Sequence, residues 1–378
     1  MLASCHNQQN ATQNKKYDDI INRVKQKFVP DSRDHIFEIK FDQKDNSLIL
    51  SGTSDYPQAL NALTDSLEKH HISFKDQVRM LPLKEFKNKI GITRLSVANL
   101  RSKPEHSAEL VTQALMGTPL HIFENKNGFY HVQTPEGYYA WGDAAGIKIL
   151  NQHEFQDWLS KEKMIVTAVF GQVYEKPNKN ANPVSDMVIN DVFAKLEVED
   201  NFVKVLYPDG RTGYISTENL VDLNEFDATN KQYALPDDVI IFAGQFLGIP
   251  YLWGGTSAKG MDCSGFTKTV YASLGYLLPR DASQQVKVGK KIDLDDNFSQ
   301  LRAGDLLFFG KIKNGKEKIT HVAIHIKNGK IIHATGEVKI ESLNPKDKNY
   351  NPDRKKSLLQ ARRILGNMPL DFSKSYKK

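Results

Sequence analysis

Cysteine is almost missing from this chain of 378 residues, which contains two, Cys5 and Cys263. Two cysteines that lie so far apart do not indicate the framework of paired disulfides on which small secreted domains rely. We therefore expect Cys263 to be a free thiol. Such a thiol is either inert in a hydrophobic core or reactive, and the residues around it must decide which.

Long apolar runs and a strong excess of charge are also missing. No stretch approaches the roughly 20 apolar residues of a membrane-spanning helix. With 51 basic and 45 acidic residues, the net charge of +6 is small and spread along the chain. This balance suits an anionic polymer or a membrane surface, but it is too weak to indicate nucleic-acid binding. The hydrophobic content of 40% is enough for packed cores, and the length predicts two to four domains.

The N-terminus carries a short pattern typical of lipoproteins. The segment LASC (residues 2–5) resembles a lipobox, in which the cysteine is lipidated, and a polar run follows it. The charged and apolar parts of a signal peptide are missing, because Met1 stands directly before the box. We expect residues 1–14 to be a lipoprotein tether with a membrane lipid anchor at Cys5; a chance match of four residues is the alternative.

Residues 15–84 alternate between helical and strand patterns. YDDIINRVKQKF and YPQALNALTDSLEKHH have helical periodicity, whereas FEIKF, SLILSG and QVRMLP are typical of strands. The segment contains no cluster of catalytic residue types. We expect a small α+β domain that serves as an interaction or spacer module.

An internal repeat occupies the middle of the chain. VANLRSKP (97–104) matches FGQVYEKP (170–177), and residues 127–147 match residues 200–220. Each unit is a series of short alternating stretches separated by Asn, Gly, Pro and Asp, as in a small β-barrel. The two units resemble bacterial SH3-like (SH3b) domains, whose signatures include an early xxLRxxP strand and a late GYxGW-type strand. The expected boundaries are 85–152 for the first domain and 160–224 for the second, which is the weaker match.

After a polar link around residues 222–235, a third pattern begins. PDDVIIFAGQFLG predicts a helix, and a second helix is expected from about 263 to 274, with Asp262 at its N-cap. Unpaired backbone N–H groups and the positive end of the helix dipole favour a thiolate there. Cys263 lies in this first turn, so we predict a reactive cysteine; a buried structural cysteine is the alternative.

Two histidines follow in the strand patterns of HVAIHIKNGKIIHATG. With a two-residue loop, NG, His333 would oppose Ile324 and face away from His321. With a three-residue loop, KNG, and a left-handed glycine, Ala323 pairs with His333, which then lies diagonally beside His321. We predict the three-residue loop, because it lets one ring orient the other.

In that arrangement His321 can act as general base toward Cys263, and His333 can orient it, as in a Cys-His-polar triad. His325 lies nearer the hairpin tip, where packing or solvent contact is expected. A zinc site of Cys263, His321 and His333 is the other chemistry that these residues allow, but no fourth ligand or paired-cysteine spacing accompanies them. We expect no metal and no cofactor.

These segments resemble the NlpC/P60 family of papain-like cell-wall peptidases. PYLWGG, GMDCSGF, LPRDASQQ, LRAGDLLFF, THVAIHI and IIHATG occur in family order within residues 234–368. With SH3b domains ahead, the chain is similar to YkfC-like γ-D-glutamyl-L-diamino-acid endopeptidases. The resemblance implies a papain-like α+β fold and cleavage of the γ-D-Glu–diamino acid amide in peptidoglycan stem peptides. It implies Cys263 as nucleophile, His321 as base and His333 as third residue.

The resemblance also implies roles for residues around the thiol. Tyr251 would support the oxyanion together with the backbone N–H of Cys263. Trp253 would line the pocket, with core packing as the alternative. Asp262 would hold the free amino group of the substrate's L-Ala while it caps the helix.

Further substrate contacts are implied on either side of the cleft. Ser264 and Arg280 match positions that contact the D-Glu carboxylate, for which arginine offers bidentate recognition; Ser283 is a weaker match. In the first SH3b domain, Tyr138 and Glu109 would contact the amino end of the substrate. The plainer alternatives are an exposed Arg280, a Tyr138 packed in the barrel core and a solvated Glu109.

The main prediction is a cysteine endopeptidase that acts on murein peptides with a free N-terminal L-Ala, in turnover or recycling. Its rival is a hydrolase of intact stem peptides whose SH3b domains anchor it to peptidoglycan. A wall-binding module without activity is disfavoured by the intact Cys263, His321 and His333, and a transferase or amidase on the same scaffold is a further alternative. Both meso-diaminopimelate and L-Lys fit the resemblance. We expect a lipoprotein of the cell envelope, or a cytoplasmic enzyme if Cys5 is not lipidated.

Overall fold

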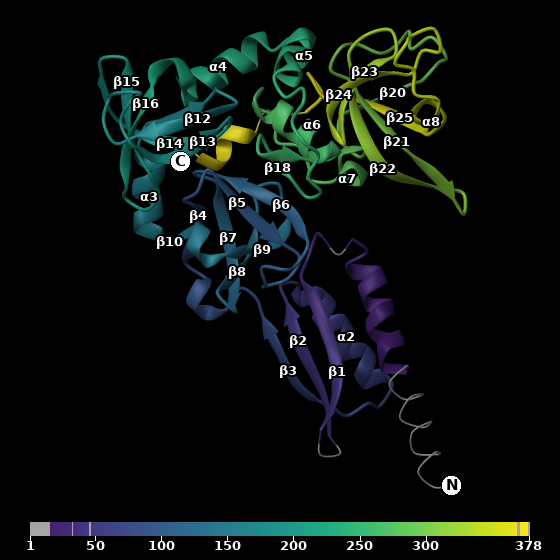
Figure 1. The fold of residues 1–378 in the computed structure, drawn as a ribbon. Coiled ribbons are helices and arrows are strands. Elements are labelled where there is room, and N and C mark those ends of the chain that lie inside the picture. Colours follow the sequence, from purple (N-terminus) through teal and green to yellow (C-terminus); the bar gives the residue numbers. More distant parts are fainter. Residues whose placement is uncertain (1–15, 32, 45–46, 369–370, 377–378) are drawn as a thin grey trace.

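The computed structural model describes residues 16–31, 33–44, 47–368 and 371–376. Figure 1 shows a purple N-terminal unit, two β-rich units in blue and teal, and a C-terminal unit in green and yellow. The predicted tether with Cys5 lies outside the described residues. No helix among those described is both long and apolar enough to cross a bilayer.

The N-terminal unit is a three-stranded sheet covered by two helices. Its elements are a helix over residues 16–28, β1 (Phe37–Lys44), β2 (Ser47–Ser54), α2 (Pro57–Lys69) and β3 (Lys75–Met80). Strands β1 and β2 are antiparallel, and β3 runs parallel to β2 after α2. Ile20, Leu63 and Leu67 of the helices pack with Leu50 of β2, so the amphipathic faces supply the core.

Two seven-stranded sheets follow, and they share one strand order. The first contains β4 (Lys89–Thr93), β5 (Val97–Arg101), β6 (Leu110–Leu115), β7 (Pro119–Lys126), β8 (Phe129–Gln133), β9 (Tyr139–Asp143) and β10 (Ile147–Asn151). The second contains β11 (Lys163–Val166), β12 (Phe170–Tyr174), β13 (Pro183–Val188), β14 (Val192–Glu199), β15 (Phe202–Leu206), β16 (Thr212–Ser216) and β17 (Leu220–Asp222). The orders are β10-β4-β7-β8-β9-β5-β6 and β17-β11-β14-β15-β16-β12-β13, which match strand for strand. Gly137 and Gly210 close equivalent hairpins with φ of 88° and 90°, a conformation that favours glycine.

Two helices connect these sheets to each other and to the C-terminal unit. They are α3 (Gln152–Ser160) and α4 (Leu223–Tyr233). Helix α4 occupies the segment that the sequence indicates as a polar link, and its helical form was not predicted. The side chain of Asp222 accepts hydrogen bonds from the backbone N–H groups of Asn224 and Glu225, which caps the helix despite its polar composition.

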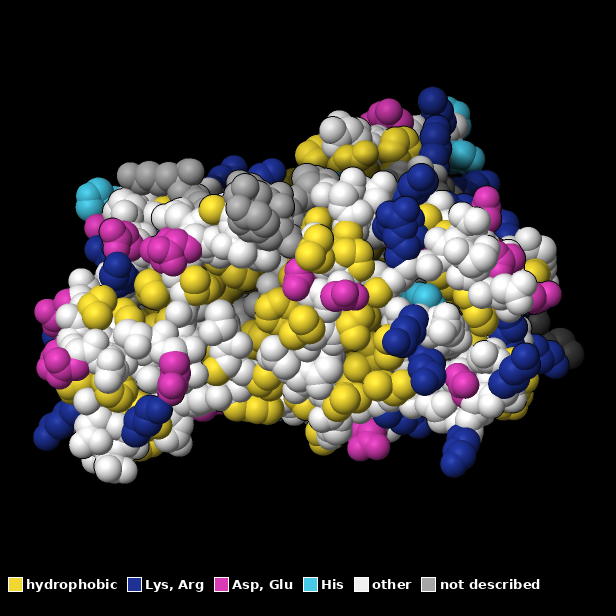
Figure 2. Space-filling view, turned by 90° about the horizontal axis from the view of Figure 1, so that it is seen from above, with side chains coloured by type: hydrophobic (Ala, Val, Ile, Leu, Met, Phe, Trp, Pro, Cys, Tyr) yellow, Lys and Arg dark blue, Asp and Glu magenta, His cyan; other side chains and the backbone are white. Residues whose placement is uncertain are grey.

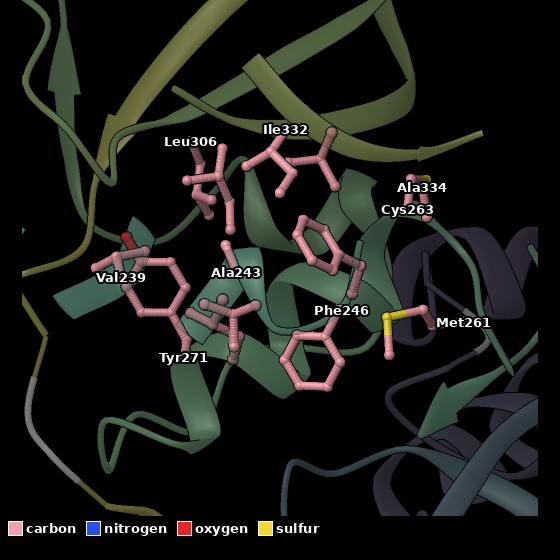
Figure 3. Packing of buried hydrophobic residues seen from close by; sticks show 14 of the residues in the cluster. Val239, Ala243, Phe246, Met261, Cys263, Tyr271, Leu306, Ile332 and Ala334 are labelled. Atoms are coloured by element: carbon pink, nitrogen blue, oxygen red, sulfur yellow. The ribbon is translucent and has the colours of Figure 1, made fainter. Parts of the chain in front are cut away.

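The C-terminal unit packs helices against an antiparallel sheet of order β20-β25-β21-β22-β23-β24. Its strands are β20 (Lys290–Ile292), β21 (Leu306–Lys313), β22 (Lys316–His325), β23 (Lys330–Thr335), β24 (Glu337–Ser342) and β25 (Leu358–Arg363), with the short hairpin β18 (Thr256–Ser257) and β19 (Gly260–Met261). Its helices are α5 (Pro236–Gly244), α6 (Cys263–Ala272), α7 (Ala282–Gln285) and α8 (Pro352–Lys356). Figure 3 shows Phe246, Leu306 and Ile332 in the core between α5, α6 and the sheet, with Cys263 at its periphery.

The first barrel contacts the C-terminal unit beside the start of α6. The backbone N–H of Gln113 donates to Oγ1 of Thr256 at 3.2 Å, and the N–H of Thr256 donates to Oε1 of Gln113 at 2.9 Å. A Cβ on Gly254 would lie 2.1 Å from the carbonyl oxygen of Leu110, so glycine is required where the loop passes the barrel. The glycine-rich loop is therefore shaped by its contact with another domain.

Another face of the molecule carries an apolar groove. Figure 2, seen from above the view of Figure 1, shows hydrophobic side chains in the middle of the face where α4 and α5 lie. Leu235 and Ile241 are exposed there, and a groove of about 430 Å³ lies beside them, with Phe226 and Phe242 in its walls. None of the predicted site residues lines this groove.

Candidate active site

The local sequence fixes the start of α6, where the predicted nucleophile lies. Oδ1 of Asp262 accepts a hydrogen bond from the backbone N–H of Gly265 at 2.8 Å, so the predicted N-cap is confirmed. A Cβ on Gly265 would lie 2.0 Å from the carbonyl oxygen of Gly255. The glycines therefore let the loop pack directly on the first turn of the helix that begins with Cys263.

The hairpin between β22 and β23 brings the two histidines together. Ile324 pairs with Ile332, and Gly329 is left-handed with a φ of 78°. This register confirms the three-residue loop and excludes the pairing of Ile324 with His333. Nε2 of His321 lies 2.8 Å from Nδ1 of His333, with the ring planes at 84°.

A carboxylate that the sequence analysis did not identify continues this chain of groups. Nε2 of His333 lies 3.2 Å from Oε2 of Glu341 on β24. Glu341 also accepts a hydrogen bond from Nδ2 of Asn351 at 2.8 Å and pairs with Lys339 at 3.1 Å. A proton on Nε2 of His333 is therefore favoured, which leaves its Nδ1 lone pair to accept from Nε2–H of His321. The free nitrogen of His321, Nδ1, can then act as the base.

The charge state of the thiol differs from the prediction. Burial and the charge of Asp262 raise the pKa of Cys263 to about 11, although the backbone N–H groups of Val322 and Ser264 act in the opposite direction. Burial also lowers the pKa of His321 well below its usual value. The dry surroundings outweigh the helix start, because both charged forms lose hydration there. In the free protein the thiol of Cys263 and the imidazole of His321 are therefore both neutral, and the helix start does not by itself create a thiolate.

Tyr251, the predicted hydrogen-bond donor to an oxyanion, lines the same cavity as Cys263. Its side chain is half-buried, and burial is the main cause that raises the pKa of Tyr251 to about 12. The phenol therefore keeps its proton at neutral pH and can donate to a negative oxygen that develops next to the sulfur.

Arg280 is buried beside the start of α6 rather than exposed. It is 2% exposed, and its Nη2 lies 2.6 Å from Oδ2 of Asp262. Its Nη1 donates to Oγ of Ser264 at 3.0 Å. The exposed alternative is therefore wrong. The guanidinium, the carboxylate and the hydroxyl form one hydrogen-bonded cluster directly behind the nucleophile.

A cavity of about 440 Å³ opens above the thiol. It is lined by the predicted residues Glu109, Tyr138, Tyr251, Trp253, Asp262, Cys263, Ser264, Arg280 and Ser283, and also by Arg33 and Asp281, which the sequence analysis did not assign. His321 on β22 and His333 on β23 are not among the residues that line it. The structure thus gathers side chains from three units of the chain around one space.

On the side of the first barrel, the cavity is lined by side chains for which core packing or simple solvent exposure was the alternative. Trp253 is 65% exposed, which excludes core packing, and its Nε1 donates to Oε1 of Glu109 at 2.6 Å. Glu109 is exposed, yet this bond joins it to the cleft. Tyr138 is half-buried at the cavity rather than packed in the barrel core, and burial raises its pKa to about 12.

Other histidines and metal-type clusters add nothing to this site. His325 is 2% exposed, and its Nδ1 lies 3.0 Å from the carbonyl oxygen of Arg302, so it is a packed residue. Within the described residues, no group of three or more His, Cys, Asp and Glu side chains is placed to hold a metal ion.

The sequence matches known protein families. A model of the NlpC/P60 family matches residues 248–359, and a model described as the bacterial dipeptidyl-peptidase Sh3 domain matches residues 100–145. A Bacillus cereus protein named gamma-D-glutamyl-L-lysine dipeptidyl-peptidase is 31% identical over 236 residues, which cover 60% of this chain and 67% of that protein. A Bacillus subtilis protein of the same name is 40% identical over 144 residues, 36% of this chain and 47% of its own length.

A solved structure extends the similarity to the arrangement of the domains. An NlpC/P60 family protein from Bacillus cereus matches with a TM-score of 0.62 and 26% identity, over 74% of this chain and 100% of that one. The thiol at a helix start, the paired histidines on adjacent strands and the sequence matches agree with one another. The chain belongs to the NlpC/P60 family of cysteine peptidases.

Proposed function

We propose that this peptidase hydrolyses the amide between γ-D-Glu and an L-diamino acid in peptidoglycan peptides whose N-terminal L-Ala is free. The supporting observation is the composition of the cavity beside Cys263. The carboxylate of Glu109 and the phenol of Tyr138 line it, together with the carboxylate of Asp262, which is also paired with Arg280. Acidic and phenolic groups suit an ammonium group, and one cavity holds them together with the nucleophile.

The names of the relatives agree with this substrate class. Two Bacillus proteins at 31% and 40% identity are named for the γ-D-glutamyl-L-lysine bond. The second matches over about half of its own length. The free amino end and a role in murein turnover or recycling are our extension from the cavity.

The reaction follows from the neutral thiol and imidazole. When substrate enters, the Cys263 proton passes to Nδ1 of His321 as the sulfur attacks the amide carbon, and the carbonyl oxygen becomes an oxyanion. The phenol of Tyr251 donates to that oxygen. The intermediate collapses, the C–N bond breaks, and the amine of the diamino acid takes the proton from His321. A water molecule, deprotonated by His321, then hydrolyses the thioester and restores the thiol.

We further infer the roles of the remaining units. The equal strand order of the two barrels supports a second SH3-like domain at residues 160–224. The lipobox resemblance supports a place in the cell envelope with Cys5 as the lipid anchor. Purification of the full-length protein from membranes, followed by mass spectrometry of its mature N-terminus, tests that placement, and an unmodified Cys5 would oppose it.

One assay tests the proposed reaction. The protein is incubated with L-Ala-γ-D-Glu-L-Lys, with its meso-diaminopimelate counterpart, with N-acetylated forms of both, and with intact sacculi, and the products are identified by mass spectrometry. We expect the free peptides to be cleaved, and the acetylated peptides to be cleaved at least about tenfold more slowly. Release of peptides from sacculi at a similar rate would instead favour the wall hydrolase with SH3b anchors. The Cys263→Ala variant should cleave nothing.

A further inference from the structure

The N-terminal unit sends one side chain into the catalytic cavity. Nη1 of Arg33 donates to Oδ2 of Asp281 at 2.6 Å and to Oγ of Ser283 at 3.1 Å. Both acceptors belong to the start of α7, 248 and 250 positions away in the sequence. Arg33 also lines the cavity that contains Cys263. A unit with no catalytic cluster of its own therefore reaches the substrate site.

Arg33 is held in this position by its own loop. Asp31 binds it in a bidentate manner, with Oδ1 at 2.7 Å from Nε and Oδ2 at 2.7 Å from Nη2. Planar pairs of this kind are geometrically specific, so the guanidinium is presented to α7 in a fixed orientation. Lys287 lies 4.0 Å from the same carboxylate.

The same loop is also fixed to the first barrel. The hydroxyl of Tyr139 donates to Oδ2 of Asp55 at 2.5 Å, and the N–H of Ile36 donates to Oδ1 of that carboxylate at 2.8 Å. Tyr139 directly follows Tyr138, which lines the cavity. The segment 33–36 therefore spans from the barrel strand beside Tyr138 to the start of α7.

The charges decide what Arg33 can do there. Asp31 and Asp281 already flank its guanidinium, so a further anion would meet two carboxylates at that point, and an anion site is disfavoured. Arg33 is instead suited to hold α7 against the N-terminal unit. Arg33 lines the cavity together with Tyr138, Asp281 and Arg280.

We propose that the N-terminal unit is a specificity element of the peptidase: Arg33 clamps the start of α7 and closes the cleft at the end beside Tyr138, so that only peptides with an unsubstituted amino end are accepted. This inference rests on the proposed function, in which Tyr138 marks the amino end of the substrate. A peptide that continued beyond L-Ala, through an acyl group or a glycan, would have to pass the segment that Arg33 holds in place.

The test compares two variants of the full chain, both with Cys5→Ser. Arg33→Ala removes the clamp, and Arg79→Ala is the matched control, because it removes another ion pair of the N-terminal unit, to Glu124 of the first barrel at 2.9 Å. The measured quantity is the ratio of kcat/KM for L-Ala-γ-D-Glu-L-Lys to that for its N-acetyl form. We expect this ratio to fall about tenfold in Arg33→Ala and to change less than about twofold in Arg79→Ala. If the parent protein is active and the ratio is unchanged in Arg33→Ala, the role of Arg33 is overturned, whereas the proposed function is not.

A second measurement does not depend on peptide hydrolysis. Iodoacetamide and a polyethylene-glycol maleimide are reacted with Cys263, and the ratio of their rate constants reports the width of the cleft. Arg33→Ala should raise the relative rate of the bulky reagent about fivefold, and Arg79→Ala should leave it unchanged. If the parent protein cleaves neither peptide, the proposed reaction fails. The closure of the cleft by Arg33 is then tested by the ratio of the two alkylation rate constants alone. Equal ratios in the parent protein, Arg33→Ala and Arg79→Ala would refute that closure.

Discussion

At the scale of single residues, the carboxylate of Glu341 and the imidazole of His333 form the outer part of the proposed catalytic relay. Glu341→Leu removes the acceptor 3.2 Å from Nε2 of His333, so the ring can take the tautomer that cannot accept from His321. We expect kcat/KM to fall about 10- to 100-fold, by analogy with the loss when the outer partner of a metal-binding histidine is removed. Glu341→Gln keeps an acceptor oxygen and should lose less.

The control for this prediction is Glu337→Leu, which removes an exposed carboxylate from the same strand. Peptide hydrolysis and thermal unfolding are measured for all three variants. Equal activity of the leucine variants at equal Tm would show that Glu341 does not position His333.

The thiol and imidazole together predict a specific pH dependence. With the pKa of Cys263 at about 11, the thiolate fraction should rise about tenfold per pH unit at neutral pH. Burial lowers the pKa of His321 well below 6.5, so the imidazole is already unprotonated at pH 6.5. We therefore expect kcat/KM for the peptide to be flat just above pH 6.5. The inactivation rate by iodoacetamide, measured against pH, checks this. A plateau from about pH 5 upward would instead indicate a preformed thiolate–imidazolium pair.

The positions of Cys263 at a helix start and of His321 beside His333 were predictable from sequence, but the electrostatics around them were not. Cys263 and His321 follow from position in a helix and a strand. Glu341 follows only from the register across the turn at Gly336, for which the sequence offered no anchor. The raised pKa of the thiol depends on its burial in the folded protein, which an argument from the helix start alone does not include.

At the scale of elements, the β22–β23 hairpin should make the protein sensitive to acid. Burial lowers the pKa of His321, His325 and His333, the last to about 4. Between that pKa and 6.5, the unfolded chain binds more protons than the folded one, so the free energy of unfolding decreases as the pH falls. Each such histidine contributes up to about 1.4 kcal/mol per pH unit.

Urea denaturation at a series of pH values measures this slope. His325→Leu removes one of the buried rings without touching the relay and should make the slope shallower, whereas the same change at the exposed His121 serves as control. An identical slope in both variants would contradict the assignment to buried histidines.

Two glycines in helices are expected to respond in opposite ways to alanine. A Cβ on Gly265 would lie 2.0 Å from the carbonyl oxygen of Gly255, so Gly265→Ala must displace the start of α6. We expect it to lower the free energy of unfolding by several kcal/mol and to abolish hydrolysis. A Cβ on Gly244 in α5 meets nothing within 4 Å, so Gly244→Ala should be neutral or stabilising by up to about 1 kcal/mol. Chemical denaturation of both variants checks the pair; equal effects would show that the close approach is not what constrains Gly265.

The elements themselves followed from periodicity more closely than their boundaries. The three-residue hairpin loop was predictable because face alternation and a glycine restrict the register. Helix α4 was not, because its polar surface masks the helical period and its cap at Asp222 resembles a loop residue.

At the scale of the whole molecule, the internal repeat was predictable and domain docking was not. Repeats are visible in the sequence because both copies use the same turns. The contact of Arg33 with Asp281 joins segments 248 positions apart, and no local pattern encodes it. For this reason the sequence predicts only an interaction or spacer module for the N-terminal unit, whereas in the structure its Arg33 lines the cavity.

The two barrels have the same strand order, but their equivalent hairpins make different contacts. In the first barrel the turn presents Tyr138 to the cavity. In the second, the matching Arg211 pairs with Asp209 and donates to the carbonyl oxygen of Arg94 at 2.8 Å, so it joins the barrels. We therefore expect Tyr138→Ala to raise KM for the free peptide about tenfold with little change in Tm. Arg211→Ala should lower Tm and leave KM unchanged. Steady-state kinetics and thermal unfolding of both variants test this division, and a KM effect from Arg211→Ala equal to that from Tyr138→Ala would show that both barrels shape the cleft.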